Sequence, residues 1–310
     1  MNNLEPINQT KLYGLKNHLL ELVRLFKEKI YPNKILLSGQ KGIGKSTLAY
    51  HFINYILSDN EEFKYDIKNF EINTKSKAFK TLINLTNTNL TIVDVKSDIK
   101  SIDINQIRDL IINLNKSSFN NKPRFVLIDN IELLNASSVN ALLKILEEPN
   151  DNIFFILIHN NKKVLPTLLS RCINYKISLN NKQCLEITNN LLEENFENLV
   201  NRDIINYYSS PGDIYYLVKF ANQYKYDLSK LYLKDLLKIL IKDNQYKKDL
   251  FIKNIMFGFL EFYLRKLNES FSKKIHDKYN YFLRRISDTK SYNLDEESLF
   301  TEFNEEVLNG

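Results

Sequence analysis

The stretch GQKGIGKS, from Gly39 to Ser46, has the residues and spacing of a phosphate-binding loop. It matches G-x-x-x-x-G-K-[ST] between an apolar run and a helical pattern, so a chance glycine-rich turn is the weaker alternative. Backbone N–H groups of such a loop surround phosphate oxygens. Lys45 is expected to reach the β- and γ-phosphates, and the Ser46 hydroxyl to bind Mg²⁺. The predicted nucleotide contacts in this loop are Gly39, Gly42, Gly44, Lys45, Ser46 and Thr47.

A carboxylate follows a second apolar run, in the stretch FVLIDNIE. Asp129 ends this predicted strand and is expected to face the same Mg²⁺, directly or through water, although a lone Asp after a strand is more often a turn former. Where ATP-hydrolysing sites of this type usually carry a second carboxylate, the chain has Asn130. An amide can orient water but cannot accept its proton at neutral pH. Glu132 is interpreted as a solvated loop carboxylate.

The elements that must position these residues alternate along the first part of the chain. Strands are predicted over residues 34–38, 90–95, 124–129, 153–158 and 173–178, and the continuous apolar runs at 124–129 and 153–158 are typical of strands buried on both faces. Helical periodicity occupies residues 46–57, 104–114 and 135–149, the last with Asn135 as a plausible N-cap and Pro149 as its end. Strands alternating with helices predict an α/β layer with a mostly parallel sheet.

The composition bounds the class of protein. The chain has 310 residues and 44% hydrophobic content, enough for two or three domains. Its net charge of +6 permits contact with nucleic acid without requiring it. The sequence contains no apolar run of about 18 residues, so no membrane span is predicted. The N-terminus lacks the pattern of a secretion signal. Cys172 and Cys184 form neither a disulfide framework nor a zinc pair, so a reducing cytoplasm is expected.

A longer stretch carries a family resemblance: DNIELLNASSVNALLKILEEPNDNIFFILIHNNKKVLPTLLSRC. It resembles the clamp-loader branch of the AAA+ ATPases, specifically the bacterial DNA polymerase III clamp loader, and NALLKILEEP and LPTLLSRC are its distinctive parts. The likeness covers Leu12 to about Gly212. It implies an AAA+ core with a parallel sheet over residues 1–179, a helical lid over 180–222, and an all-α oligomerisation collar over 223–310. An aromatic stripe in this collar, FGFLEFYLRKL, is either core or interface.

Three departures make the chain more similar to delta-prime subunits than to gamma/tau ATPase subunits. The first is Asn130, which removes the general base. The second is the lack of cysteine in residues 58–123, where gamma/tau subunits carry a four-cysteine zinc module, so no zinc is expected. The third is Gly212 in SSPGD, which stands where AAA+ ATPases commonly place a sensor arginine. Together these departures imply a subunit released from hydrolysis.

The resemblance also assigns roles to residues near the end of the predicted core. Arg171, in SRC, is expected to project into the ATP site of a neighbouring subunit and brace the γ-phosphate there. The alternative is an arginine that is salt-bridged at the entrance of a strand. Cys172 is expected to be a small buried side chain. His159 and Asn160 are candidate sensors of the γ-phosphate, and ordinary hydrogen-bonded loop residues remain an equal alternative for them.

The resemblance therefore implies a clamp-loader subunit that holds ATP or ADP with Mg²⁺, or only a vestigial site, and contributes Arg171 in trans. The implied partners are gamma/tau ATPase subunits, the delta subunit and, through the assembly, a sliding clamp and primer-template DNA, with no membrane. One rival hypothesis is an autonomous, gamma/tau-like ATPase in which another residue replaces the base. Another is an independent DNA-binding module, but no basic or aromatic platform supports it.

Overall fold

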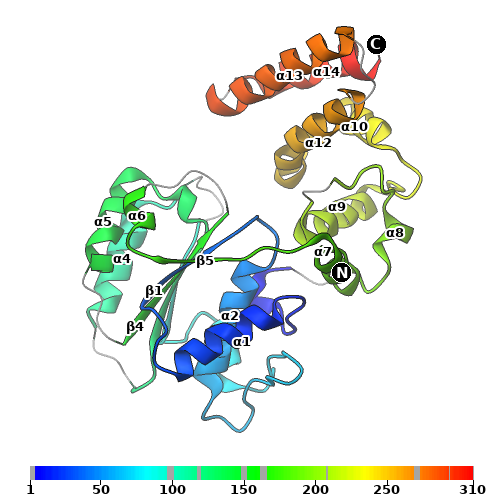
Figure 1. Ribbon diagram of the computed structural model, residues 1–310. Helices are drawn as coiled ribbons and strands as arrows, with labels where there is room; N and C mark the ends of the chain where they lie inside the picture. The colour runs from blue at the N-terminus through cyan, green and yellow to red at the C-terminus, as the bar shows by residue number, and fades with distance from the viewer. Residues whose placement is uncertain are drawn as a thin grey trace. The chain divides into compact units, whose positions relative to one another are not determined.

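The chain folds into two compact units, Met1–Ile187 and Thr188–Gly310. The structure is a computed structural model that describes residues 4–95, 101–116, 120–147, 152–160, 166–206, 209–268, 273–292 and 294–309 (Figure 1). The finer division into a core, a lid and a collar stays a prediction. No helix among the described residues is long and apolar enough to span a membrane.

A five-stranded sheet, in the order β2-β3-β4-β1-β5, is the centre of the first unit. Its strands are β1 (Lys34–Ser38), β2 (Leu90–Val93), β3 (Arg124–Ile128), β4 (Ile153–His159) and β5 (Ile173–Lys176). Every strand pair is parallel, which confirms the predicted parallel α/β sheet. Because parallel strands bring their carboxyl ends to one edge, the residues that follow β1, β2, β3 and β4 gather there.

Helices cover both faces of this sheet, as Figure 1 shows. One face packs against α1 (Lys16–Lys27), α2 (Lys45–Ser58) and α3 (Lys77–Ile83), and the other packs against α4 (Ile104–Leu114), α5 (Ala136–Glu147) and α6 (Pro166–Leu169). Successive strand residues alternate between the two cores: Ile35 and Leu37 belong to the first, and Leu36 to the second. Burial on both faces explains why β1, β3 and β4 are largely apolar, whereas β5, at the edge of the sheet, is mostly exposed.

The predicted helices form, and their apolar residues face the core. In α2, the buried apolar residues include Leu48, Ala49, Phe52, Ile53 and Leu57, and Ile56 is partly buried. The start of α5 is fixed as expected, since Asn135 Oδ1 accepts a hydrogen bond of 2.8 Å from the Ser138 N–H. Pro149, the expected end of this helix, lies outside the described residues.

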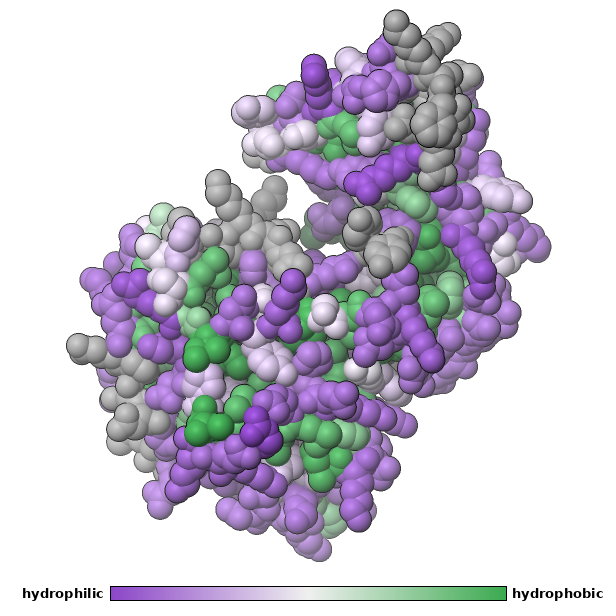
Figure 2. Space-filling model, in the orientation of Figure 1, coloured by the Kyte–Doolittle hydropathy of each residue, from purple (hydrophilic) through white to green (hydrophobic). Residues whose placement is uncertain are grey.

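The second unit is helical. Its helices are the C-terminal part of α7 (Asn181–Leu192), α8 (Phe196–Leu199), α9 (Pro211–Tyr224), α10 (Leu233–Lys242), α11 (Gln245–Lys248), α12 (Leu250–Asn268), α13 (Lys273–Tyr292) and α14 (Glu296–Phe303). A π-helical turn, Asn304–Leu308, follows α14. Phe257, Phe259 and Leu260 of the aromatic stripe are buried in the hydrophobic core of this unit, so these members of the stripe are core residues. The surface drawn in Figure 2 is mostly hydrophilic, with apolar side chains in small separate areas.

A buried histidine ties the N-terminal segment to α2. His51 is fully buried, its Nε2 lies 3.0 Å from the Gln9 carbonyl oxygen, and its Nδ1 lies 2.8 Å from the Tyr65 hydroxyl. A carbonyl only accepts, so Nε2 carries the proton and the neutral ring accepts from Tyr65. Burial lowers the pKa of His51 from 6.5 to about 4.

This depressed pKa predicts a loss of stability in acid. Between pH 6.5 and about 4 the unfolded chain binds a proton that the folded chain rejects, so stability falls with pH by up to roughly 3 kcal/mol. Denaturant unfolding at several pH values in this window measures the slope. The His51→Gln variant cannot bind this proton, so the slope of its unfolding free energy against pH should be smaller by the contribution of one proton. An unchanged slope in the variant would contradict the assignment.

Candidate nucleotide site and interface arginine

The loop between β1 and α2 is built for close approach of a phosphate. The Gly39 N–H donates to the His159 carbonyl oxygen, and a Cβ on Gly39 would lie 2.3 Å from the Ile177 carbonyl oxygen, so only glycine fits there. Gly42 and Gly44 have φ of 81° and 92°, in the left-handed region that favours glycine. The sequence therefore forms the strand–loop–helix geometry that the motif requires.

The first turn of α2 presents N–H groups ahead of its hydrogen-bonded ladder. The Leu48 N–H donates to the Gly44 carbonyl oxygen at 2.9 Å. The N–H groups of Lys45, Ser46 and Thr47 precede this bond and lack carbonyl partners within the helix. Together with the helix dipole, they form an arrangement suited to phosphate oxygens.

Lys45 lies within the loop itself. Its side chain is 3% exposed, and its Nζ donates to the carbonyl oxygens of Gly39 and Gln40 at 2.9 Å and 2.6 Å. Burial lowers the pKa of Lys45 to about 8, and the charges of Asp129 and Glu132 partly oppose this shift. In the chain alone the ammonium thus binds loop carbonyls, which a phosphate would have to replace.

Ser46 and Asp129 meet as the Mg²⁺ hypothesis requires. The Ser46 hydroxyl donates to Asp129 Oδ2 at 2.5 Å. Burial raises the pKa of Asp129, and the hydrogen bond from Ser46 opposes that rise. One hydroxyl and one carboxylate suit Mg²⁺, which keeps several waters and binds few protein oxygens. In the described part of the chain, no group of three or more His, Cys, Asp or Glu residues is arranged to hold a metal ion.

Asn130 is held by hydrogen bonds to both atoms of its amide. It adopts the left-handed conformation, with φ 54°. Its Nδ2 donates to Asp94 Oδ1 at 2.9 Å, and its Oδ1 accepts from Asn160 Nδ2 at 2.9 Å. The carboxyl ends of β2, β3 and β4 are thereby joined through the side chains of Asp94, Asn130 and Asn160.

Glu132 corrects one sequence interpretation. It was expected to be a solvated loop carboxylate, but it is half-buried in a 3-10 turn, Ile131–Leu133, and accepts from the Asn160 side chain at 2.9 Å and from the Asn160 N–H at 3.3 Å. Asp94 carried no signal in the sequence that would have marked it as part of this site. Of the two sensor candidates, Asn160 joins this network, and His159 ends β4 in register with Ser38.

The pKa of Lys45 predicts that nucleotide binding depends on pH. Phosphates favour the charged ammonium, whereas the free chain loses this proton above about pH 8. Binding above pH 8 therefore requires proton uptake, and affinity for Mg-ATP should fall about tenfold per pH unit there. Calorimetry in two buffers of different ionisation enthalpy measures the uptake. The variant Lys41→Ala removes an exposed lysine whose charge lowers the Lys45 pKa, so it should retain this dependence with the midpoint moved to higher pH. A pH-independent affinity in the unaltered chain would contradict the prediction.

Arg171 lies between α6 and β5 and is 34% exposed. Its Nε and Nη2 donate to Glu147 Oε1 at 3.1 Å and 2.7 Å, and its Nη1 donates to the Thr167 carbonyl oxygen at 2.9 Å. The salt-bridged arginine considered from the sequence is thus the arrangement in the single chain. Glu147 is 53% exposed, so the ion pair remains accessible to a partner.

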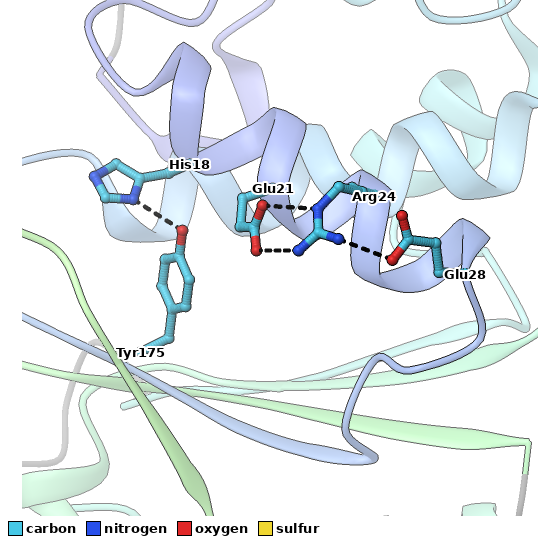
Figure 3. Close-up of polar contacts among 5 residues, drawn as sticks. All are labelled: His18, Glu21, Arg24, Glu28 and Tyr175. Carbon is cyan, nitrogen blue, oxygen red and sulfur yellow. Dashed lines mark hydrogen bonds and ion pairs between the residues drawn. The ribbon is translucent and has the colours of Figure 1, made fainter.

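Helix α1 anchors the strand that follows Arg171. His18 Nδ1 of α1 lies 3.0 Å from the Tyr175 hydroxyl of β5, and Figure 3 shows these side chains pointing toward each other. On the same helix, Arg24 contacts Glu21 and Glu28 in exposed ion pairs (Figure 3). His18 thus links α1 to β5 through the Tyr175 hydroxyl.

Two further residues named from the sequence, Cys172 and Gly212, pack or cap within the fold. Cys172 is half-buried, and desolvation raises the pKa of its thiol to about 11, which keeps it protonated. Gly212 lies in the first turn of α9, where the Asp213 N–H donates to Ser210 Oγ at 3.2 Å and the Ser210 N–H donates to Asp213 Oδ2 at 3.1 Å. Gly212 therefore belongs to the capped first turn of α9 and, as a glycine, supplies no guanidinium.

The comparisons with known proteins define the family. A family model described as "DNA polymerase III, delta subunit" matches residues 15–181, more than half of the chain. The chain therefore belongs to this family, and its first unit has the parallel α/β sheet expected from the sequence. Among relatives, DNA polymerase III subunit delta' of Buchnera aphidicola (subsp. Schizaphis graminum) is 31% identical over 58% of this chain and 53% of its own length. The chain is accordingly delta-prime-like.

Other relatives lie at similar distances. Subunit delta' of Pseudomonas aeruginosa is 30% identical over 46% of this chain and 42% of its own length. Subunit gamma/tau of Mycoplasma genitalium is 29% identical over 64% of this chain and 31% of its own. The match thus spans about half the length of the delta' relatives. A solved gamma subunit-related protein of Thermotoga maritima has a TM-score of 0.46 at 16% identity, covering 92% of this chain and 96% of its own.

Proposed function

We propose that this chain is a clamp-loader subunit that binds nucleotide without hydrolysing it and supplies Arg171 to the ATP site of an adjacent gamma/tau-type subunit. The observation that carries the proposal is the state of Asn130. Its amide occupies the position of the general base and has both of its polar atoms engaged, by Asp94 and Asn160. The Asn130 amide cannot accept a proton at neutral pH, and its hydrogen bonds also hold it in place.

The conformation of Asn130 supports the same conclusion. Asparagine tolerates the left-handed region better than most residues, whereas a longer carboxylic side chain there is strained. A carboxylate at this position would also lie against Asp94, whose Oδ1 is 2.9 Å from the present amide nitrogen. The local structure therefore favours an amide over a base.

The rival hypothesis of an autonomous ATPase needs another base, and Glu132 is the candidate that the network offers. Both of its carboxylate oxygens accept hydrogen bonds from Asn160. A base must be free to take a proton from water, and these two contacts oppose that role. We therefore place hydrolysis in the partner subunit.

The nucleotide proposed for this chain is ATP or ADP with Mg²⁺, held by the loop, Ser46 and Asp129. Gamma/tau ATPase subunits and a delta subunit are the proposed direct partners. A sliding clamp and primer-template DNA are the proposed substrates of the assembly. The cytoplasmic location expected from the cysteine content stays a prediction.

The test of this function is reconstitution with purified gamma/tau-type and delta subunits. We expect this chain to co-elute with them in size-exclusion chromatography, and DNA-dependent ATP hydrolysis and clamp loading to require its presence. Full activity of the partners without this chain would contradict the proposal.

A further inference from the structure

The ion pair of Arg171 has a geometry that bears on its use in trans. Two N–H groups of the guanidinium, on Nε and Nη2, donate to one oxygen of Glu147, and a third, on Nη1, donates to the Thr167 carbonyl oxygen. An arginine has five N–H donors. Among the described residues, two donors therefore remain for a ligand, one on each terminal nitrogen.

Both acceptors belong to ordered helices. Glu147 is the last residue of α5, whose Leu142 and Leu146 are fully buried in the sheet core, and Thr167 belongs to α6, whose Leu168 is buried. The guanidinium is thus held between two packed elements, although the arginine itself is a third exposed. A long side chain without such contacts samples several rotamers.

We infer that Glu147 is a positioning residue for Arg171, which orients the guanidinium so that its remaining N–H groups face the phosphate of a neighbouring subunit. The inference rests on the proposed function of Arg171. Stability does not explain the pair, because ion pairs this exposed contribute little to folding. Orientation is a different effect, since catalytic contributions of a charged donor depend steeply on its placement.

The alternative role for Glu147 is to compete with the neighbour's phosphate for Arg171. The two roles predict opposite changes in ATP hydrolysis when Glu147 is removed. If Glu147 orients the arginine, its removal lowers hydrolysis by the assembly. If Glu147 competes with the phosphate, its removal raises hydrolysis. The contact at Thr167 remains in either case.

The test compares DNA-dependent ATP hydrolysis by the reconstituted assembly for Glu147→Ala, Glu147→Gln, Arg171→Ala and the double variant Glu147→Ala/Arg171→Ala. We expect Glu147→Ala to lower the Arg171-dependent part of kcat by about threefold to tenfold with little change in KM. The conservative variant Glu147→Gln keeps an acceptor oxygen and should retain most of the rate. The double variant should be no slower than Arg171→Ala alone, because Glu147 acts through Arg171.

The chain offers a matched control in Glu21→Ala. Arg24 donates through the same two nitrogens, Nε at 3.1 Å and Nη2 at 2.8 Å, although to the two different oxygens of Glu21, and the pair lies on a helix remote in sequence (Figure 3). This control should leave the rate unchanged. If Arg171→Ala lowers activity but Glu147→Ala has a rate equal to or above that of the unaltered chain, the inference is overturned. If Arg171→Ala has no effect, the proposed function fails first.

Discussion

Replacing Arg171 with alanine should lower DNA-dependent ATP hydrolysis and clamp loading by the assembly while leaving the assembly intact. The neighbour's γ-phosphate would lose a fixed cationic donor that stabilises charge in the transition state. In some GTPases such arginines are worth roughly a thousandfold or more in rate. In the proposed assembly this chain serves one ATP site among several, so we expect a large loss at that site and a partial loss in bulk hydrolysis.

The chain itself should tolerate the change. Arg171 makes one exposed ion pair and one carbonyl contact, so its removal should cost no more than about 1 kcal/mol of folding free energy. Arg171→Lys should restore little activity, because an ammonium cannot reproduce the planar set of donors. Size-exclusion chromatography verifies equal assembly before rates are compared. Unchanged rates in an intact assembly would make Arg171 a structural residue.

The second large effect is the absence of hydrolysis by the chain alone. The purified protein should turn over ATP far below the ordinary enzyme rate of about 1 per second or more. The family resemblance implies a base at position 130 and a cation at position 212 in hydrolysing subunits, and this chain has Asn130 and Gly212 there. Steady-state phosphate release, with Lys45→Ala as the background, measures this rate. Turnover at the ordinary rate that Lys45→Ala abolishes would refute the prediction, and its loss in Glu132→Gln would identify the base.

A carboxylate supplied at position 130 should not restore hydrolysis. Asn130→Glu places a longer side chain in the left-handed conformation and next to Asp94. Like charges at this distance raise the pKa of one carboxylate and displace the side chain. Asn130→Asp adds the same charge with a side chain that fits the backbone better. Comparing ATP hydrolysis by the two variants therefore separates the effect of backbone strain from the effect of charge.

The fold was predictable because its strands are recognisable by composition. Leu36 and Leu37 pack against different helical layers, so the interior of β1 has no polar position, and its bounds, Lys34–Ser38, agree with the predicted run. The loop was equally predictable, since its glycines, Lys45 and Ser46 are adjacent in the chain. Local geometry alone brings them together.

The rest of the site depends on tertiary contacts that spacing does not encode. Asp94, Asn130 and Asn160 meet only because β2, β3 and β4 are neighbours in the sheet. Glu132 was expected to be a solvated loop carboxylate, whereas the left-handed Asn130 begins a 3-10 turn that brings Glu132 to the Asn160 side chain. The Glu147–Arg171 pair joins residues 24 positions apart, through the packing of α5 and α6.

The central claim is that this chain does not hydrolyse ATP but acts on a neighbour's ATP. A structure of the reconstituted assembly with Mg²⁺ and a non-hydrolysable ATP analogue tests it most directly. We predict that the Arg171 guanidinium lies within hydrogen-bond distance, about 2.7–3.2 Å, of the γ-phosphate bound to the adjacent gamma/tau-type subunit. A fully assembled complex in which that γ-phosphate is contacted by other groups, with Arg171 directed away from it, would contradict the account.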